Sequence, residues 1–291
     1  MTETLWSGLT LGAVYVIVAL GFLVSYLPSG VINFAQGAVV AAGTYLTYQW
    51  FKDGMSTWLA IVLNLVCGVA LGVFCEVVAI RPLRWGIVRK GQSSELVTTV
   101  GVSTMIIGII GIIWGDNALS VPFHGPQSIT RFVGIVTPPV AIYMVVASVV
   151  AGVGLHLLFR KTRWGQACLA VAEDRASAGL RGINVNLLSL IAFGGAGALG
   201  TVSAILIGPI TYATPSVGTS LALGGFVAIA MGGNGSFLGC LGGGLAVGVV
   251  SAFATRYLGA AYSNSSILIL LLIVLSVRPA GLAGVGGTRN V

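Results

Sequence analysis

The chain has 291 residues, of which 56% are hydrophobic and only 7% are charged. Soluble domains carry about 25% charged residues, so this composition excludes a soluble enzyme or binding module and predicts an integral membrane protein. The net charge of +7 does not indicate nucleic-acid binding, because the basic residues belong to segments that flank the membrane.

Five apolar runs come first along the chain, near residues 5–27, 31–51, 58–80, 96–115 and 140–159. The first contains Gly8 and Gly12 in a GxxxG pattern, which is typical of close helix packing in membranes. Pro28, Ser29 and Gly30 are expected to break the helix before the second run resumes from residue 31. Residues 116–137 form a polar loop that contains proline.

The one long polar stretch of the chain, residues 160–186, follows the fifth run. It contains five basic residues and the adjacent acids Glu173 and Asp174. Good helix formers and an apolar face at helical spacing predict one short amphipathic helix, from Trp164 to Ala178, at the cytoplasmic face. Gly179 and Gly182 are expected to end this helix. The pattern alone leaves open that the stretch is a solvated connecting loop.

Three further apolar runs follow, near residues 187–210, 219–256 and 263–277. The middle run is too long for one helix, and the glycine-rich residues 232–235 are expected to split it. A spanning helix needs about 20 apolar residues, so we expect about nine spans within a range of eight to ten. The predicted fold is an all-α polytopic transmembrane helix bundle with broken helices, in a single membrane domain over residues 1–291.

The basic residues predict the orientation of the bundle. Residues 81–90 hold four of them, residues 160–186 hold five and the C-terminal tail holds two. These segments fall on one side of the membrane, whereas Lys52, Arg131 and Arg256 fall on the other. The positive-inside rule makes the basic side cytoplasmic, with the C-terminus inside and the N-terminus outside.

The sequence lacks the motifs of nucleotide-binding, catalytic and metal-binding sites. The sequence has no GxxxxGK[ST] motif for nucleotide phosphates, and its two histidines are far apart, so we expect no catalytic residue, metal site or cofactor. The four cysteines form no CxxC pair and are expected to be small hydrophobic residues rather than ligands or disulfides. Glu76 and Glu95 are the acids near the inner halves of spans, and Glu76 is expected to pair with Arg81 or Arg84.

Six stretches of the chain together carry a family resemblance. They are GLTLGAVYVIVALGF at 8–22, GVINFAQG at 30–37, Glu76 followed by RPLR at 81–84, TTVGVS at 98–103, residues 162–186, and RPAGLAG at 278–284. In this order the chain resembles the membrane permease subunits of bacterial branched-chain (hydrophobic) amino acid ABC importers. The resemblance implies a multi-pass protein of the cytoplasmic (inner) membrane that moves a small-molecule solute through the lipid membrane. It also implies three kinds of partner: a homologous permease subunit, cytoplasmic ABC ATPase subunits and an extracytoplasmic substrate-binding protein.

The resemblance gives residues 160–186 the role of a cytoplasmic coupling-helix loop that meets the ATPase. Glu173 and Asp174 would face the ATPase, with Gly165 and Gly182 setting where the helix begins and ends. The family commonly has arginines where this chain has Gln166 and Leu169, which puts ionic contacts from those two positions in doubt. The residues assigned to coupling are Arg163, Trp164, Gly165, Ala172, Glu173, Asp174, Gly182 and Asn184.

A second set of residues is assigned to the translocation path. Asn33, Gln36 and Gly37 follow the helix break at residues 28–30, and unwound backbone at depth is tolerated where it lines a cavity. Their polar side chains would offer hydrogen bonds to a zwitterion, and interhelical hydrogen bonding is the equal alternative. Thr98 and Thr99 are added with a weaker argument, because threonine hydroxyls often bond their own helix.

Three alternative functions stay open at this point. The same machine could carry urea, short amides or small organic acids. An ion-driven secondary carrier is less favoured, because such carriers usually need ionisable groups near the membrane centre. A membrane scaffold without transport activity is the third.

Overall fold

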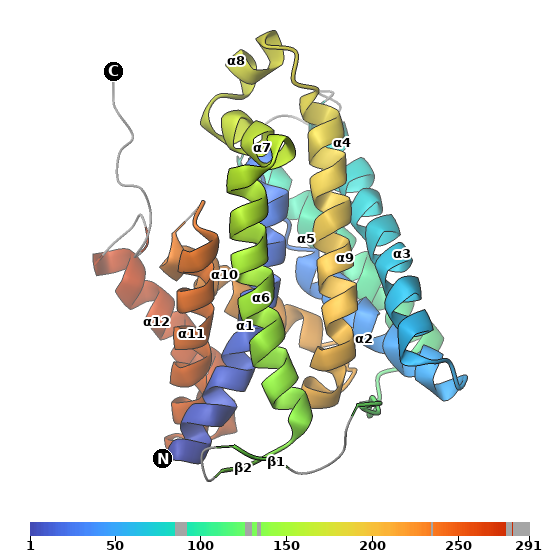
Figure 1. The fold of residues 1–291 in the computed structure, drawn as a ribbon, viewed down its shortest axis with the longest axis vertical. Helices are drawn as coiled ribbons and strands as arrows, with labels where there is room; N and C mark the ends of the chain where they lie inside the picture. The colour runs from blue at the N-terminus through green and yellow to red at the C-terminus, as the bar shows by residue number, and fades with distance from the viewer. Residues whose placement is uncertain (85–91, 126–129, 133–134, 234, 278–280, 282–291) are drawn as a thin grey trace.

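The computed structural model describes residues 1–84, 92–125, 130–132, 135–233, 235–277 and 281. In this part of the chain the predicted apolar runs form nine helices (Figure 1). These are α1 (Thr2–Ser29), α2 (Gln36–Lys52), α3 (Thr57–Cys75), α5 (Gln92–Trp114), α6 (Pro139–Lys161), α9 (Val185–Thr211), α10 (Val217–Gly232), α11 (Phe237–Tyr257) and α12 (Ser263–Val277). The prediction of an all-α polytopic bundle is confirmed.

Two of these helices are not among the segments long enough to span a membrane, whereas the 15-residue α12 reaches span length together with the preceding turn at residues 260–262. Within the described residues, seven helical segments are long and apolar enough to cross a membrane, judged by length and composition alone. The 17-residue α2 and the 16-residue α10 fall short of the roughly 20 residues that a span needs. Both are largely buried by their neighbours, as expected for broken helices inside a bundle.

Short elements extend or connect the helices. The π-helical segment η1 (Glu76–Ile80) and α4 (Arg81–Arg84) continue α3, and the 3-10 turn η2 (Ala260–Tyr262) leads into α12. In the predicted polar loop, β1 (Thr130–Phe132) and β2 (Ile135–Thr137) form an antiparallel pair with Thr130 opposite Thr137. This small hairpin was not among the predictions. Residues 85–90 of the basic loop, Asn234 and all but Gly281 of the RPAGLAG stretch lie outside the described residues.

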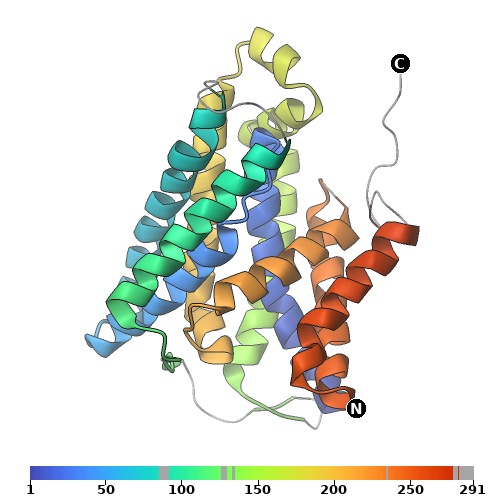
Figure 2. The same cartoon turned by 180° about the vertical axis from the view of Figure 1, so that it is seen from behind.

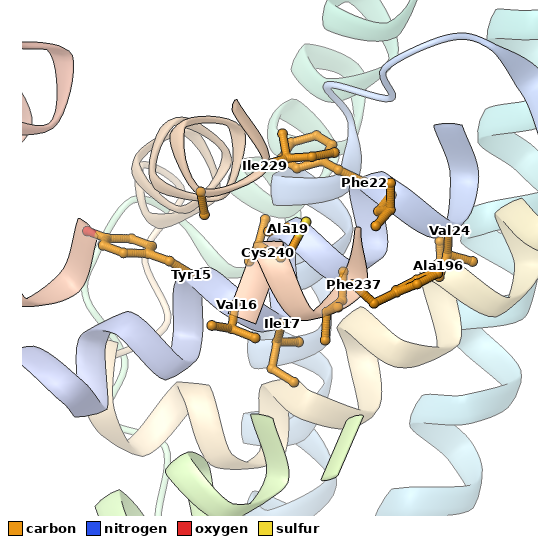
Figure 3. Packing of buried hydrophobic residues seen from close by; sticks show 14 of the residues in the cluster. Tyr15, Val16, Ile17, Ala19, Phe22, Val24, Ala196, Ile229, Phe237 and Cys240 are labelled. Carbon is orange, nitrogen blue, oxygen red and sulfur yellow. The ribbon is translucent and has the colours of Figure 1, made fainter. Parts of the chain in front are cut away.

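Helix α1 lies at the centre of the bundle and packs against α6, α9, α10 and α11. Its side chains point into several neighbours at once, so that Phe22, for example, is fully buried (Figure 3). Gly8 and Gly12 face α11, where an added Cβ would lie 2.8 Å from the Cα atoms of Val249 and Leu245, respectively. The close packing predicted from the GxxxG pattern is therefore confirmed.

The two ends of the bundle differ in charge as predicted. Helix α4 and the two short helices of residues 160–186 lie at one end, and the N-terminus, β1 and β2 lie at the other (Figure 1). Arg256 also belongs to the N-terminal end, since its guanidinium donates a 2.7 Å hydrogen bond to the hydroxyl of Thr4. The end rich in arginine and lysine is therefore assigned to the cytoplasm.

Two expectations about individual side chains are also met. Glu76 is fully buried and accepts a 3.1 Å hydrogen bond from Nε of Arg81, which is the predicted ion pair. All four cysteines are free, and Cys75, Cys168 and Cys240 are buried.

Candidate functional site

The polar stretch at residues 160–186 folds as two helices rather than one. Helix α7 (Arg163–Glu173) ends before Asp174, and α8 (Arg175–Leu180) begins directly after it. The prediction of one helix from Trp164 to Ala178 is therefore wrong. The reason lies in the side chain of Asp174, which caps α8: it accepts hydrogen bonds from the main-chain N–H groups of Ala176, at 2.9 Å, and Ser177, at 3.2 Å. Asp174 itself takes an extended backbone conformation and interrupts the helix.

Each helix of this stretch starts at a capping side chain. Thr162 accepts a hydrogen bond from the N–H of Gly165 at 3.1 Å at the start of α7. Asn184 accepts one from the N–H of Leu187 at 3.1 Å at the start of α9. These caps satisfy main-chain donors that a helix terminus leaves open, so the loop has a defined shape. Asn184, which was assigned to coupling, has this local role in the structure.

The two glycines assigned to the helix ends behave differently. Gly182 follows α8 with a φ of 84°, a left-handed conformation that favours glycine, so its predicted place at a helix end is confirmed. Gly165 does not mark the start of α7, which begins at Arg163. It is buried in the first turn, where an added Cβ would lie 2.5 Å from the carbonyl oxygen of Phe159. Gly165 therefore allows the close approach of α6 and α7. Gly179 lies inside α8, not at its end.

Helix α7 is amphipathic, as predicted. Cys168 and Val171 are buried against the bundle, whereas Ala172 and Glu173 are exposed. The helical spacing predicts Trp164 and Ala172 on the same apolar face as Cys168 and Val171. Trp164 is 55% exposed and Ala172 is exposed as well, so the prediction is wrong for these two residues. Ala172 and Glu173 line a cavity of about 530 Å³ that also involves α6 and the start of α11. The exposed end of α7 thus combines a carboxylate with a hollow in the cytoplasmic surface.

Arg175 connects this loop to the centre of the bundle. Its guanidinium donates a 2.9 Å hydrogen bond to the main-chain carbonyl of Ser29, the last residue of α1. Partial burial lowers the pKa of Arg175, and the carboxylates of Glu76 and Glu95 oppose that effect. The arginine therefore lies in a region whose acidic side chains favour its charge. Sequence analysis counted Arg175 only as one of five basic residues, because its partner is a distant carbonyl group.

The helix break after α1 begins later and is longer than predicted, because Pro28 and Ser29 still belong to α1. Gly30 ends α1 in the left-handed conformation, with a φ of 74°, and α2 begins only at Gln36. Asn33 is 1% exposed, and its Oδ1 accepts a hydrogen bond from the N–H of Ala35 at 3.2 Å. That side chain therefore satisfies main chain in the non-helical segment, which explains why the helix does not resume at residue 31.

Gln36 reaches across the bundle. Its side chain is 1% exposed and donates a 2.9 Å hydrogen bond to the carbonyl of Ala196, near the middle of α9. The neighbouring Gly37 packs against α10, where an added Cβ would lie 2.8 Å from the Cβ of Ala222. The short helices α2 and α10 therefore meet near their first turns. The structure gives Gln36 an interhelical hydrogen bond, which was one of the two predicted roles, and the path role stays a prediction.

The two threonines of α5 bond their own helix. Thr98 and Thr99 donate hydrogen bonds to the carbonyl of Glu95, at 3.1 and 2.9 Å. Thr99 is fully buried, whereas Thr98 is partly exposed. Among the described residues, neither hydroxyl forms a hydrogen bond to the non-helical segment at residues 30–35.

Comparison with known proteins identifies the fold and the family. The fold matches a chain in the structure of PsaBC from Streptococcus pneumoniae in complex with Fab, with a TM-score of 0.53 over 94% of this chain and 91% of that one. The sequence identity is 13%, so this likeness concerns the fold alone.

Other relatives share a higher sequence identity with this chain. The chain is 29% identical to the high-affinity branched-chain amino acid transport system permease protein LivH of Salmonella typhimurium, covering 97% of this chain and 95% of the relative. It is 30% identical to the corresponding protein BraD of Pseudomonas aeruginosa over the same shares. The model of the family described as branched-chain amino acid transport system / permease component matches residues 4–277. The chain therefore belongs to the family of branched-chain amino acid transport permease components.

Proposed function

We propose that this chain is the transmembrane permease subunit of an ATP-driven importer for branched-chain or other hydrophobic amino acids. It lies in the inner membrane of a bacterium, forms the translocation path and does not itself hydrolyse ATP. Its partners are a homologous permease subunit, cytoplasmic ABC ATPases and an extracytoplasmic substrate-binding protein. The match of the family model over residues 4–277 supports this assignment most strongly.

In this proposal the ATPase acts on α7 and α8. Glu173 is exposed beside the cavity at the end of α7, which suits contact with a protein partner. Arg163, Trp164 and Ala172, the other residues of α7 assigned to coupling besides Gly165, are all exposed. Asp174 contributes by fixing the start of α8, so its role is to shape the loop as well as to present charge.

Arg175 then carries the movement into the membrane. Its hydrogen bond to Ser29 ties α8 to the end of α1, directly before the break at residues 30–35. Beyond that break, Gln36 is bonded to the middle of α9. A shift of α8 would therefore act on the junction of α1 and α2 through defined contacts.

The path is proposed to run beside this junction. Asn33, Gln36 and Gly37 lie where α2 begins, and α10 begins next to them. Helix N-termini carry partial positive charge, so short helices that begin inside a bundle can attract an anionic group such as a carboxylate. Thr98 and Thr99 would belong to the path only in another conformation, because they bond their own helix here.

Reconstitution tests the function directly. The permease is purified with its cognate partners, placed in proteoliposomes and supplied with binding protein and radiolabelled leucine. Uptake that requires ATP inside and binding protein outside supports the proposal. If uptake continues without ATP but stops when an ion gradient is collapsed, the protein is an ion-driven carrier and the proposal is wrong.

A further inference from the structure

A groove of about 510 Å³ lies between α6 and α9, next to α7. Its lining is almost entirely aliphatic and aromatic, and Val24 of α1 contributes to it from the core. Ser203 is its one hydroxyl residue, and that hydroxyl donates a 2.6 Å hydrogen bond to the carbonyl of Leu199 in its own helix. The α9 side of the groove is therefore apolar, and its one hydroxyl group already has a hydrogen-bond partner.

The groove has the length of a lipid chain. It follows α9 from Leu188 to Ser203, which is about 22 Å at about 1.5 Å per residue. One leaflet of the bilayer core is about 15 Å thick, half of the full hydrocarbon thickness. An acyl chain that enters at the cytoplasmic surface can therefore lie in the groove as far as the middle of the membrane.

The cytoplasmic end of the groove is cationic. Trp164 and Leu188 line both the groove and a second cavity of about 250 Å³, which is also lined by Arg163 and Asn184. Arg163 is exposed, as is Lys161 in the last turn of α6, and neither forms an ion pair within the described part of the chain. Arg160, also in that turn, lines the separate cavity beside Glu173. Tryptophan at the membrane interface with a cluster of basic side chains favours an anionic lipid headgroup.

We propose that this groove binds an anionic phospholipid from the cytoplasmic leaflet. One acyl chain lies between α6 and α9, and the phosphate lies at Arg163 and Asn184. Helices α6 and α9, which supply most of its lining, lie on the face of the bundle turned to the viewer in Figure 1. The poorly buried helices α5 and α12 lie on the opposite face, which Figure 2 shows with α10 between them.

The lipid would contact the coupling loop itself. Gly165 and Cys168 of α7 line the groove, so an acyl chain there supports α7 from the membrane side. The proposed phosphate site joins the start of α7 to the start of α9 through Arg163 and Asn184. The bound lipid would thus hold α7 in place whichever solute the protein carries.

Lipid binding to the full-length chain tests the proposal. The delipidated protein is titrated with phosphatidylglycerol or phosphatidylcholine in detergent micelles, and bound lipid is counted by native mass spectrometry. We expect phosphatidylglycerol to bind in preference. Gly195→Phe should lower the affinity for both lipids by about tenfold, corresponding to about 1.4 kcal/mol of binding free energy. Position 195 lines the groove and has nothing within 4 Å of an added Cβ, so the ring enters the groove without meeting backbone.

Matched variants separate the two parts of the site. Gly154→Phe is the control for the groove, because Gly154 of α6 is also exposed with open space at its Cβ but does not line the groove. Arg163→Gln should lower the affinity for phosphatidylglycerol by about fivefold and leave the affinity for phosphatidylcholine unchanged, as expected for loss of one cation at the membrane surface. Arg181→Gln, in the same loop but outside both cavities, should change neither.

Three results would overturn the proposal. They are equal binding of phosphatidylglycerol by the wild type and Gly195→Phe, equal binding of the two lipids by the wild type, and release of a co-purifying protein by Gly195→Phe with lipid binding intact. If Gly195→Phe does not assemble, the smaller Gly195→Leu replaces it. A phosphatidylglycerol with a photoreactive acyl chain gives an independent measurement: labelling of residues 188–203 supports the site, and labelling confined to other helices contradicts it.

Discussion

The guanidinium of Arg175 donates a 2.9 Å hydrogen bond to the main-chain carbonyl of Ser29. Ser29 is the last residue of α1, and Arg175 is the first residue of α8. One side chain thus joins the cytoplasmic loop to the most deeply packed helix of the bundle. It does so directly before the non-helical segment that leads to Gln36, so this contact is the most direct connection between the two predicted functional regions.

Loss of this contact should uncouple transport from ATP hydrolysis. A hydrogen bond from a charged donor contributes about 1.5–3 kcal/mol, so Arg175→Ala should lower ATP-dependent uptake by about tenfold or more. The protein should still assemble, because Arg175 belongs to a surface loop and not to the core of the bundle. The measurement is solute transported per ATP hydrolysed in proteoliposomes, with the amount of assembled complex determined by size-exclusion chromatography.

Arg181→Ala is the matched control, since Arg181 lies in the same loop and its charge makes only a small contribution to the lowered pKa of Asp174. Arg175→Lys should recover only part of the activity, because a lysine keeps the charge but is shorter and lacks the planar fork of the guanidinium. If the wild type and Arg175→Ala transport the same amount of solute per ATP hydrolysed, the hydrogen bond to Ser29 does not take part in coupling.

The two acids at the end of α7 should differ in what they contribute. Replacing Glu173 and Asp174 together with alanine should leave the protein in the membrane but reduce its stimulation of the ATPase. Asp174→Ser should retain most of the stimulation, because serine also accepts the capping hydrogen bonds of α8. Glu173→Gln should reduce it if the carboxylate meets a cation of the ATPase. Unchanged stimulation in the double alanine variant would remove both residues from the coupling surface.

The cap of α8 should depend on pH. The hydroxyl of Ser177 and the N–H groups of Ser177 and Ala176 lower the pKa of Asp174 below its ordinary value. A lowered pKa means that the folded loop prefers the charged form, so the stabilisation is complete above the ordinary aspartate pKa and is lost as pH falls through the lowered pKa. Limited proteolysis between α7 and α9 should therefore increase only at strongly acidic pH. Asp174→Ser should remove this pH dependence, and an unchanged profile in that variant would rule out Asp174 as its source.

Hydropathy and glycine spacing predicted much of the bundle. The apolar runs gave the nine helices because a membrane requires every span to be an apolar helix, and Gly8 with Gly12 marked a packed face. Glu76 and Arg81 are close in sequence, so their ion pair was also predictable.

The site was less accessible to such reasoning. The helix is interrupted at Asp174 because its side chain accepts hydrogen bonds from the first N–H groups of α8. Helix propensity alone does not predict such a capping bond. Arg175 and Gln36 bond the carbonyl groups of Ser29 and Ala196, and every residue has a carbonyl, so no side-chain pattern identifies these partners. Long-range contacts to main chain therefore had to come from the structure.

The ion pair of Glu76 distinguishes a structural acid from a transport acid. Breaking a fully buried pair costs about 3–5 kcal/mol, and Glu76→Gln should cost less because the Arg81 side chain is 35% exposed. We expect a lower thermal stability in detergent but ATP-dependent uptake in the protein that remains folded. A folded Glu76→Gln variant whose uptake is abolished at every substrate concentration would instead indicate that the carboxylate takes part in transport.

The start of α2 provides the test of the translocation path. Asn33→Leu removes the oxygen that accepts the N–H of Ala35, and Gln36→Leu removes the 2.9 Å bond to Ala196. The interhelical bond of Gln36 contributes about 0.6 kcal/mol, the average for such bonds in membranes, and the local bond of Asn33 contributes about 1 kcal/mol, so both variants should assemble. If these residues form the path, uptake should fall by much more than that energy explains, with a changed maximal rate at saturating binding protein.

Thr44→Val is the control, because Thr44 is a fully buried polar residue of the same helix and bonds only the carbonyl of Ala41 among described residues. Uptake rates are measured in proteoliposomes that contain equal amounts of assembled complex. A fall in rate for Asn33→Leu and Gln36→Leu, but not for Thr44→Val, places the path at the α1–α2 break. Equal rates in all three variants would assign Asn33 and Gln36 to helix packing, because a side chain that only joins helices affects the amount of folded protein and not its turnover.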